Sequence, residues 1–288
     1  FSQRLLSAAL ALSFGIVLLV ALPATKAAAA PCDAPVVNEI ACENTKPGNP
    51  STEWQISGSG NSSIQGYATD ISVNRPKLGD PPVPIGFKIK TTSTNYHLDI
   101  YRMGYYGGMG ARKVATVNPT AFPNQPACQT QSSTGLIDCG NWTQTASWAV
   151  PSTAVSGIYF AHVVTNSGSA ESHIVFVVRD DASRSDLFFQ TSDTTWQAYN
   201  DYGGNSLYEG SPAGRAYKVS YNRPFDTNAE TPEDFVWNAE YPMVRYLEAN
   251  GYDVSYMTGV DADRSGGEML EHRVYMPVGH DEYWSGGQ

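Results

Sequence analysis

The sequence predicts a β-sandwich followed by a doubly wound α/β domain, with the change near Asp180. Before this point, short runs of alternating apolar and polar residues are separated by turn residues, which is typical of a sandwich. After it, continuous apolar runs alternate with helical segments, which is typical of a parallel sheet. We expect a signal peptide at 1–30, a linker and disulfide loop at 31–63, the sandwich at 64–180 and the N-terminal part of the α/β domain at 181–288.

The N-terminal segment has the features of a bacterial signal peptide. Arg4 is followed by apolar or small residues from Leu5 to Leu22 and then by an alanine-rich tract that ends at Ala30. We expect cleavage after Ala30, and therefore an extracytoplasmic, secreted protein with no stable membrane insertion. The alternative is a retained anchor, because the apolar run is about long enough to span a bilayer. Because the chain starts with Phe and stops just after a dense motif, we expect a fragment of a longer protein.

The charge of the chain disfavours two classes of partner. The formal net charge is −10, and removal of the leader would take away Arg4 and Lys26 but no acidic residue. A strongly acidic protein is repelled by nucleic acids and by anionic lipids. We therefore expect no nucleic-acid partner.

The four cysteines form two local pairs along the chain. Cys32 lies close to Cys42, and Cys128 lies close to Cys139. Three pairings are formally open, and we expect the two local disulfides, which an oxidising compartment would allow. The absence of a CxxC spacing and of a neighbouring histidine argues against a zinc site.

The sandwich strands are expected where alternation is clearest, namely at 83–91, 96–103, 157–163 and 173–179. The glycine-rich segment 105–110 is predicted to be a hairpin loop, because no Gly-Lys-Ser/Thr ending makes it a phosphate-binding loop.

The α/β elements follow in the order strand, helix, strand, helix, strand. They are expected at 186–192, 241–250, 252–257, a short helix ending at 269–270, and 273–278. Gly251 supplies a left-handed cap after the first of these helices. Ligands of such folds gather at the carboxyl ends of the strands. The segments 193–210 and 279–285 follow strands and are therefore the candidate site.

The segment 279–285 brings three ionisable side chains into one turn. Gly279 permits a sharp turn, and His280, Asp281 and Glu282 are the candidate catalytic residues. In an extended segment His280 and Glu282 share a face, so one could ligate a metal or act as a base while the other supports it. The alternative is a helix N-terminus at which Asp281 or Glu282 caps free amides.

The other candidate segments are 194–208, an aromatic loop with three tyrosines, and 220–224, which carries Arg223. Arg223 could bind an anionic or carbonyl group, although a surface arginine is the simpler interpretation. The tyrosines could equally be packing residues. The chain has no Gly-x-Ser-x-Gly elbow and no cysteine after residue 139, which excludes the common nucleophile templates for this stretch.

Four motifs in this order resemble the large (beta) subunit family of N,N-dimethylformamidase. They are TTWQAYNDYGGNSLY, SYNRPF, YLEANGYDVSY and VGHDEYWS, and the last is the most specific. The resemblance covers about residues 60–288 and is strongest from 186 onward. The stretch between Tyr199 and Tyr208 in the first motif is shorter than in the formamidases.

The resemblance implies an immunoglobulin-like sandwich and a flavodoxin-like α/β domain similar to class I glutamine amidotransferases. It also implies a ferric iron held by two tyrosines and a glutamate, with a histidine behind them. The glutamate and histidine fall on Glu282 and His280, and the tyrosines fall on Tyr199 and Tyr208, with Tyr202 and Tyr221 as rivals. Phenolate and carboxylate oxygens suit a hard ferric ion, which can polarise an amide carbonyl and acidify water.

We therefore predict a secreted metal-dependent hydrolase of amide-type C–N bonds acting on a small amide-like substrate. Asn200, Asn222 and Arg223 are the candidate substrate-binding residues. Assembly into a homo-oligomer is left open. The alternative function is a non-catalytic, extracellular carbohydrate- or cell-wall-binding protein in which the aromatic loop stacks on sugars.

Overall fold

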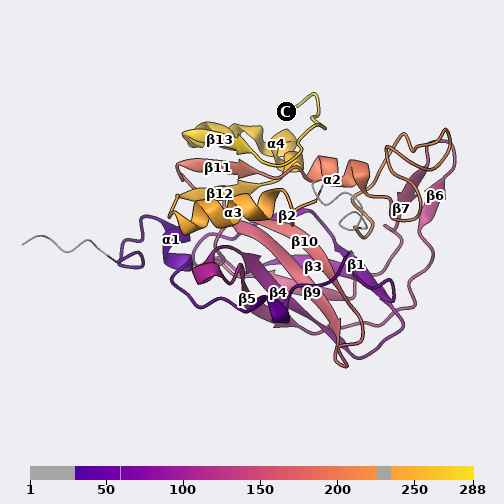
Figure 1. The fold of residues 1–288 in the computed structure, drawn as a ribbon, viewed down its shortest axis with the longest axis horizontal. Coiled ribbons are helices and arrows are strands. Elements are labelled where there is room, and N and C mark those ends of the chain that lie inside the picture. Colours follow the sequence, from indigo (N-terminus) through magenta and orange to yellow (C-terminus); the bar gives the residue numbers. More distant parts are fainter. Residues whose placement is uncertain (1–29, 59, 226–234) are drawn as a thin grey trace, which may run out of the picture. The chain divides into compact units, whose positions relative to one another are not determined.

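The computed structural model describes residues 30–58, 60–225 and 235–288. The expected signal peptide therefore lies outside the described residues. By its contacts, Pro31–Gln288 forms one compact unit. The fold of this unit is β-rich, with few and short helices (Figure 1). None of the helices in the described part of the chain is both long and apolar enough to cross a membrane.

The first half of the unit contains two facing sheets. The outer sheet has the order β1-β3-β8, with bounds Ile64–Ala68, Val83–Thr91 and Ala146–Val150. The central sheet has the order β2-β10-β9-β4-β5, with bounds Ser72–Asn74, Glu171–Arg179, Gly157–Thr165, Tyr96–Met103 and Ala111–Val117. Neighbouring strands are antiparallel except β2 and β10. The two sheets share a core that includes Phe87, Leu98 and Phe176.

The second half contains a parallel sheet with the order β12-β11-β13. Its strands are β11 Leu187–Gln190, β12 Val254–Met257 and β13 Val274–Pro277. The helices are α2 Asp193–Tyr199, α3 Glu240–Ala249, α4 Gly259–Ser265 and the 3-10 helix η4 Gly266–Glu271. As the sequence predicts, α3 is followed by Gly251 with a positive φ of 70°. The start of the segment 194–208, expected to be a loop, is instead helical, and most residues of this helix are buried, including Trp196 and Ala198.

Both faces of the parallel sheet are covered. Phe188 packs with Ala262 of α4 and Met269 of η4 on one face. Leu187 and Phe189 belong to a core on the other face, together with side chains of α3 and of the central sheet. Residues 170–195 therefore pass from one sheet to another, since β10 and β11 belong to different sheets.

The central sheet is consequently buried on both faces. Nearly every residue of β9 and most residues of β10 are buried, so these strands are covered on both faces. The physical reason is that the outer sheet covers one face while the parallel sheet and α3 cover the other. Arg102 of β4 and Glu248 of α3 form a fully buried ion pair between these layers, with N–O distances of 2.8 and 3.0 Å.

The expected linker at 31–63 contributes to this core. It contains α1 Glu39–Glu43 and the 3-10 helix η1 Ser51–Glu53. Ile40 and Trp54 are buried among residues of the central sheet and α3. Both local disulfides, Cys32–Cys42 and Cys128–Cys139, are confirmed.

Two hairpins complete the first half, and the one at 105–110 was predicted. The glycine-rich segment is a connection between the antiparallel β4 and β5 and contains the 3-10 helix η2 Tyr106–Gly108, as expected of a hairpin. A small hairpin, β6 Gln129–Gln131 and β7 Leu136–Asp138, lies between the cysteines of the second disulfide.

Candidate functional site

The candidate site lies where β11 and β13 end, as expected for a parallel sheet. The chain leaves β11 through Ser192 into α2, and it leaves β13 through Gly279, whose φ is +91°. A Cβ atom at Gly279 would lie 2.6 Å from Ser192 Oγ and 3.1 Å from Glu240 Oε1. Both the positive φ and the close approach require glycine here. The described residues 279–285 are not helical.

The two tyrosines predicted as metal ligands are brought together by local backbone structure. α2 ends at Tyr199, and the chain then turns back through Gly203 and Gly204, which both have positive φ. The Leu207 amide donates a hydrogen bond of 2.9 Å to the Ala198 carbonyl. This bond joins the residues that precede Tyr208 and Tyr199, and the two tyrosine rings are stacked with centroids 4.1 Å apart.

Glu282 meets these tyrosines from the other segment. The Tyr208 hydroxyl donates a hydrogen bond to Glu282 Oε1, and the Tyr283 hydroxyl donates to the Tyr208 hydroxyl at 2.6 Å. His280 Nε2 lies 3.1 Å from Glu282 Oε2. The ring centroids of His280 and Tyr199 are 6.0 Å apart. We call Tyr199, Tyr208, His280, Glu282 and Tyr283 the tyrosine–glutamate cluster.

The electrostatics of the cluster favour the protonated phenol. Partial desolvation, and then hydrogen bonds with Glu282, Tyr199 and Tyr283, raise the pKa of Tyr208 above its ordinary value. Tyr208 as a residue is 44% exposed, so this part of the cluster is open to solvent. A carboxylate that accepts a hydrogen bond from a phenol stabilises the neutral phenol. Without a cation the cluster therefore carries protons that a metal would have to displace.

The two rival tyrosines lie elsewhere. The Tyr221 hydroxyl donates a hydrogen bond of 2.7 Å to Asp193 Oδ2. Asp193 is fully buried, and this burial raises the pKa of Asp193 to about 6. The Tyr202 ring packs against Cys128, Cys139 and other residues near the second disulfide. Of the predicted tyrosines, Tyr208 is thus the one that contacts Glu282, and Tyr199 stacks on Tyr208.

Arg223 holds the tyrosine-bearing loop. It is fully buried, and its guanidinium donates hydrogen bonds to the backbone carbonyls of Gln197, Asn200, Tyr202 and Asn205 at 2.6–3.4 Å. Burial lowers the pKa of Arg223 to about 10, so the side chain remains charged at neutral pH. The Asn200 side chain is also buried and donates to the Pro224 carbonyl at 2.9 Å. In the structure these two predicted substrate-binding residues contact the protein backbone.

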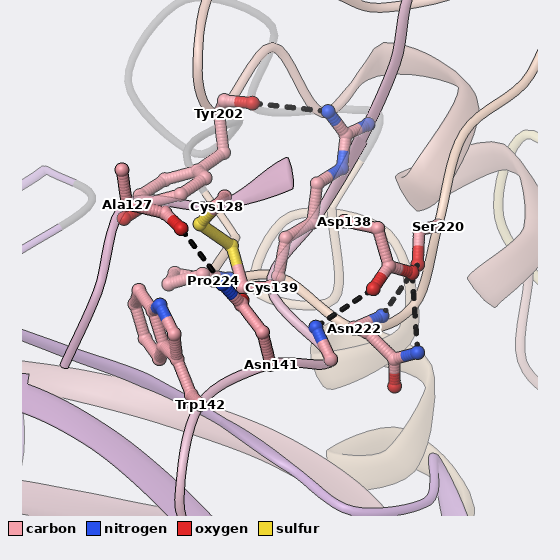
Figure 2. The surroundings of a disulfide bond; sticks show 12 residues. Ala127, Cys128, Asp138, Cys139, Asn141, Trp142, Tyr202, Ser220, Asn222 and Pro224 are labelled. Atoms are coloured by element: carbon pink, nitrogen blue, oxygen red, sulfur yellow. Dashed lines mark hydrogen bonds between the residues drawn. A yellow bond between two sulfur atoms is a disulfide. The ribbon is translucent and has the colours of Figure 1, made fainter. Parts of the chain in front are cut away.

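The second disulfide supports the same loop from outside (Figure 2). Tyr202 lies beside Cys128–Cys139, while Asn222 contacts Asp138 with an Nδ2–Oδ2 distance of 3.2 Å. Asn205 Nδ2 donates to the carbonyl of Gly135, in the turn between β6 and β7, at 2.7 Å. Asn222, also predicted to bind substrate, therefore contacts the hairpin through Asp138.

Asp281 points away from the tyrosine–glutamate cluster toward the end of β11. Gln190 Nε2 donates to Asp281 Oδ2 at 2.8 Å, and the Tyr275 hydroxyl donates to Gln190 Oε1 at 2.6 Å. Burial raises the pKa of Asp281. Its predicted catalytic role stays a prediction, as do the roles given to the other candidate residues.

Sequence reasoning missed Glu240, which lies directly beneath the site. Its Oε1 accepts hydrogen bonds from the Ser192 amide at 2.9 Å, the Ser192 hydroxyl at 2.6 Å and Trp196 Nε1 at 3.1 Å. Burial raises the pKa of Glu240 to about 7. No motif marks this residue, because its partners are distant in sequence. Tyr283 was also missed, although it belongs to the quoted VGHDEYWS motif.

A metal at this place would depend on tyrosine oxygens. Within the described residues there is no group of three or more His, Cys, Asp or Glu side chains that could hold a metal ion. The donors that converge are phenol and carboxylate oxygens, with one imidazole next to the carboxylate. Such oxygen-rich sets suit hard cations rather than zinc or copper(I).

These features define a β-rich protein with a phenol- and carboxylate-lined site at the carboxyl ends of a parallel sheet. A family model described as N,N-dimethylformamidase beta subunit-like, C-terminal, matches residues 97–288. The chain belongs to this family, as the motifs predicted.

Other comparisons add little. No curated protein matches the chain. Among solved structures, domain 1 of VCBP3 from Branchiostoma floridae is 12% identical with a TM-score of 0.26, and the match covers 42% of this chain and 97% of that one. A family 123 glycoside hydrolase from Clostridium perfringens is 11% identical with a TM-score of 0.21, covering 48% of this chain and 32% of that one. At these TM-scores neither structure supports an argument about fold or function.

Proposed function

We propose that this dimethylformamidase-like chain is part of a secreted hydrolase that cleaves amide-type C–N bonds with the help of a ferric ion. The ligands proposed are Tyr199, Tyr208 and Glu282, with His280 behind them. The observation that carries the proposal is the hydrogen bond from the Tyr208 hydroxyl to Glu282, with Tyr199 stacked on Tyr208.

The donor set fits such an ion. Phenolate and carboxylate oxygens are hard donors, and three negative ligands would balance a trivalent charge. The pKa of Tyr208 is raised in the absence of a cation, so a bound ferric ion would have to displace the proton of this phenol. When bound, a ferric ion would act as a Lewis acid toward a carbonyl and toward water.

The residues of the chain would have distinct tasks. His280 Nε2, next to Glu282 Oε2, can exchange a proton with that carboxylate and so keep it oriented. Tyr283 donates to the Tyr208 oxygen and would continue to do so after that phenol loses its proton. Arg223 holds the backbone of the loop that presents both tyrosines. Asn200, Asn222 and Asp281 remain proposed contributors to substrate binding and catalysis.

The finer fold assignment belongs to this proposal. The facing outer and central sheets support an immunoglobulin-like sandwich, and the parallel sheet with its helices supports a flavodoxin-like domain similar to glutamine amidotransferases. Export is supported by the leader-like sequence and by the two disulfides, which persist in oxidising compartments. A small amide is the proposed partner.

Iron content and colour test the proposal in the full-length protein. Wild type should bind about one iron per chain and show a visible phenolate-to-iron charge-transfer band. Glu282→Gln keeps the size of the side chain but removes a charge, so it should lose the iron and the band while it keeps the fold. Glu209→Gln makes the same change next to Tyr208 on an exposed residue, and it should retain both.

Two results would contradict the proposal. One is stoichiometric iron in Glu282→Gln, and the other is a wild-type protein that takes up no iron and shows no colour. The second result would favour the alternative of a non-catalytic cell-wall- or carbohydrate-binding protein.

A further inference from the structure

A cleft on the central sheet and α3 is lined by none of the residues of the tyrosine–glutamate cluster. It measures about 630 Å³, within the range of small-molecule sites. Its walls come from four segments far apart in sequence: the region of η1, the end of η2, β10 and the start of α3. The residues that carry the argument are Trp54, His173, Trp237, Tyr241 and Arg245.

Aromatic rings form one side of the cleft. Trp237 stacks on Trp54 with ring centroids 5.9 Å apart, and it meets Tyr241 edge-on at 5.5 Å. Trp54 is buried, whereas Trp237 and Tyr241 are only partly buried and so present ring surface to the cleft. Partly exposed Trp and Tyr rings offer apolar faces with little conformational entropy to lose on binding.

His173 contributes an unused hydrogen-bond acceptor. Its Nε2 lies 2.6 Å from the carbonyl oxygen of Trp54, which can only accept, so Nε2 carries the proton. Burial lowers the pKa of His173 to about 3, so the ring stays neutral and Nδ1 keeps its lone pair. Nδ1 is buried and has no hydrogen-bond partner among the described residues.

Arg245 contributes an unused donor at the same cleft. Its guanidinium lies 5.6 Å from the centre of the Tyr241 ring, and Nη2 donates to the Gly108 carbonyl at 3.2 Å. The buried Nε–H has no partner within the described part of the chain. Buried polar groups are normally paired, and both side chains belong to residues that line this cleft, so the unpaired acceptor and the unpaired donor indicate a ligand that supplies both.

We infer that this cleft binds a carbohydrate. A pyranose has an apolar C–H face that can stack on Trp237. Its hydroxyls can donate a hydrogen bond to His173 Nδ1 and accept one from Arg245 Nε–H. A cationic ligand is disfavoured, because no Asp or Glu is among the described residues that line the cleft while Arg245 is. The amide and hydroxyl side chains of Asn238, Gln55 and Ser51 at the same cleft can pair with further sugar hydroxyls.

Tryptophan fluorescence and calorimetry test this inference with a panel of oligosaccharides. The panel contains neutral hexose, N-acetylhexosamine and uronic acid oligomers, and at least one should bind saturably and change the emission of Trp54 and Trp237. Arg245→Met removes the donor while keeping much of the chain's bulk, and His173→Phe removes the acceptor while keeping the ring. Each should weaken binding about tenfold or more, the loss expected for one good hydrogen bond in a buried site.

Tyr246→Ala is the matched control, because this exposed aromatic lies on α3 next to Arg245 but does not line the cleft. It should bind the sugar like wild type. If no member of the panel binds, or if the sugar binds Arg245→Met and His173→Phe unchanged, the inference is wrong. Arg245 is only partly buried, so its variant is expected to fold even if His173→Phe does not. None of these variants should change iron content, which separates this inference from the proposed hydrolase.

Discussion

Glu240→Gln should change how stability depends on pH. Glu240 is fully buried beneath the candidate site, and burial raises the pKa of Glu240 from 4.5 to about 7. Between these two values the native state binds a proton that the unfolded state has lost. Stability should therefore fall as the pH rises from about 4.5 to 7 and then stay constant. Glutamine resembles the protonated carboxyl and removes this dependence.

The magnitude follows from the shift. Each pKa unit is worth about 1.4 kcal/mol, so a shift from 4.5 to about 7 corresponds to about 3 kcal/mol of lost stability at pH 8. The glutamine oxygen can keep the bonds from Ser192 and Trp196, but its amide group must occupy the place of Oε2, which has no partner among the described residues. An unpaired amide costs about 1 kcal/mol. We expect Glu240→Gln to be about 2 kcal/mol more stable than wild type at pH 8 and slightly less stable at pH 4.5.

Urea unfolding at pH 4.5, 6 and 8 and constant ionic strength measures this difference. The pKa of Asp193 is also raised, to about 6, so Asp193 likewise makes the protein less stable as the pH rises. This effect is the same in wild type and in Glu240→Gln, so the difference in stability between the two proteins reports Glu240 alone. Glu271→Gln, at an exposed surface ion pair with Arg184, is the matched control and should leave the curve unchanged. A difference between wild type and Glu240→Gln that stays constant with pH would refute the reasoning.

Two further predictions concern the support of the tyrosine loop. Arg223→Met leaves buried carbonyls without their donor, so we expect a loss of about 3 kcal/mol in urea unfolding, whereas a residue that contacts only substrate would keep stability and raise KM. Replacing Cys128 and Cys139 by alanine should cost about 3 kcal/mol on the loop-entropy model and speed amide exchange at 200–210. The Cys32–Cys42 disulfide closes a loop of similar length, so its replacement by alanine should cost about as much stability but leave amide exchange at 200–210 unchanged. Equal exchange at 200–210 in both variants would contradict the supporting role of Cys128–Cys139.

Local pattern in the sequence determined much of this protein. Continuous apolar runs located the strands of the parallel sheet, and Gly251 and Gly279 marked positions that take a positive φ. Short spacing indicated both disulfides. The meeting of Tyr208 with Glu282 could also be anticipated, because parallel strands open their carboxyl ends on one edge.

The tertiary structure decided everything that depends on partners distant in sequence. Whether Arg223 faces solvent or holds a loop depends on four carbonyls that only the folded chain assembles around it. Glu240 is buried because β11, α2 and α3 meet there, and no motif of its own records this. The central sheet shows alternation in its sequence but is buried on both faces, because alternation reports one covered face and cannot report the parallel sheet and α3 that cover the other.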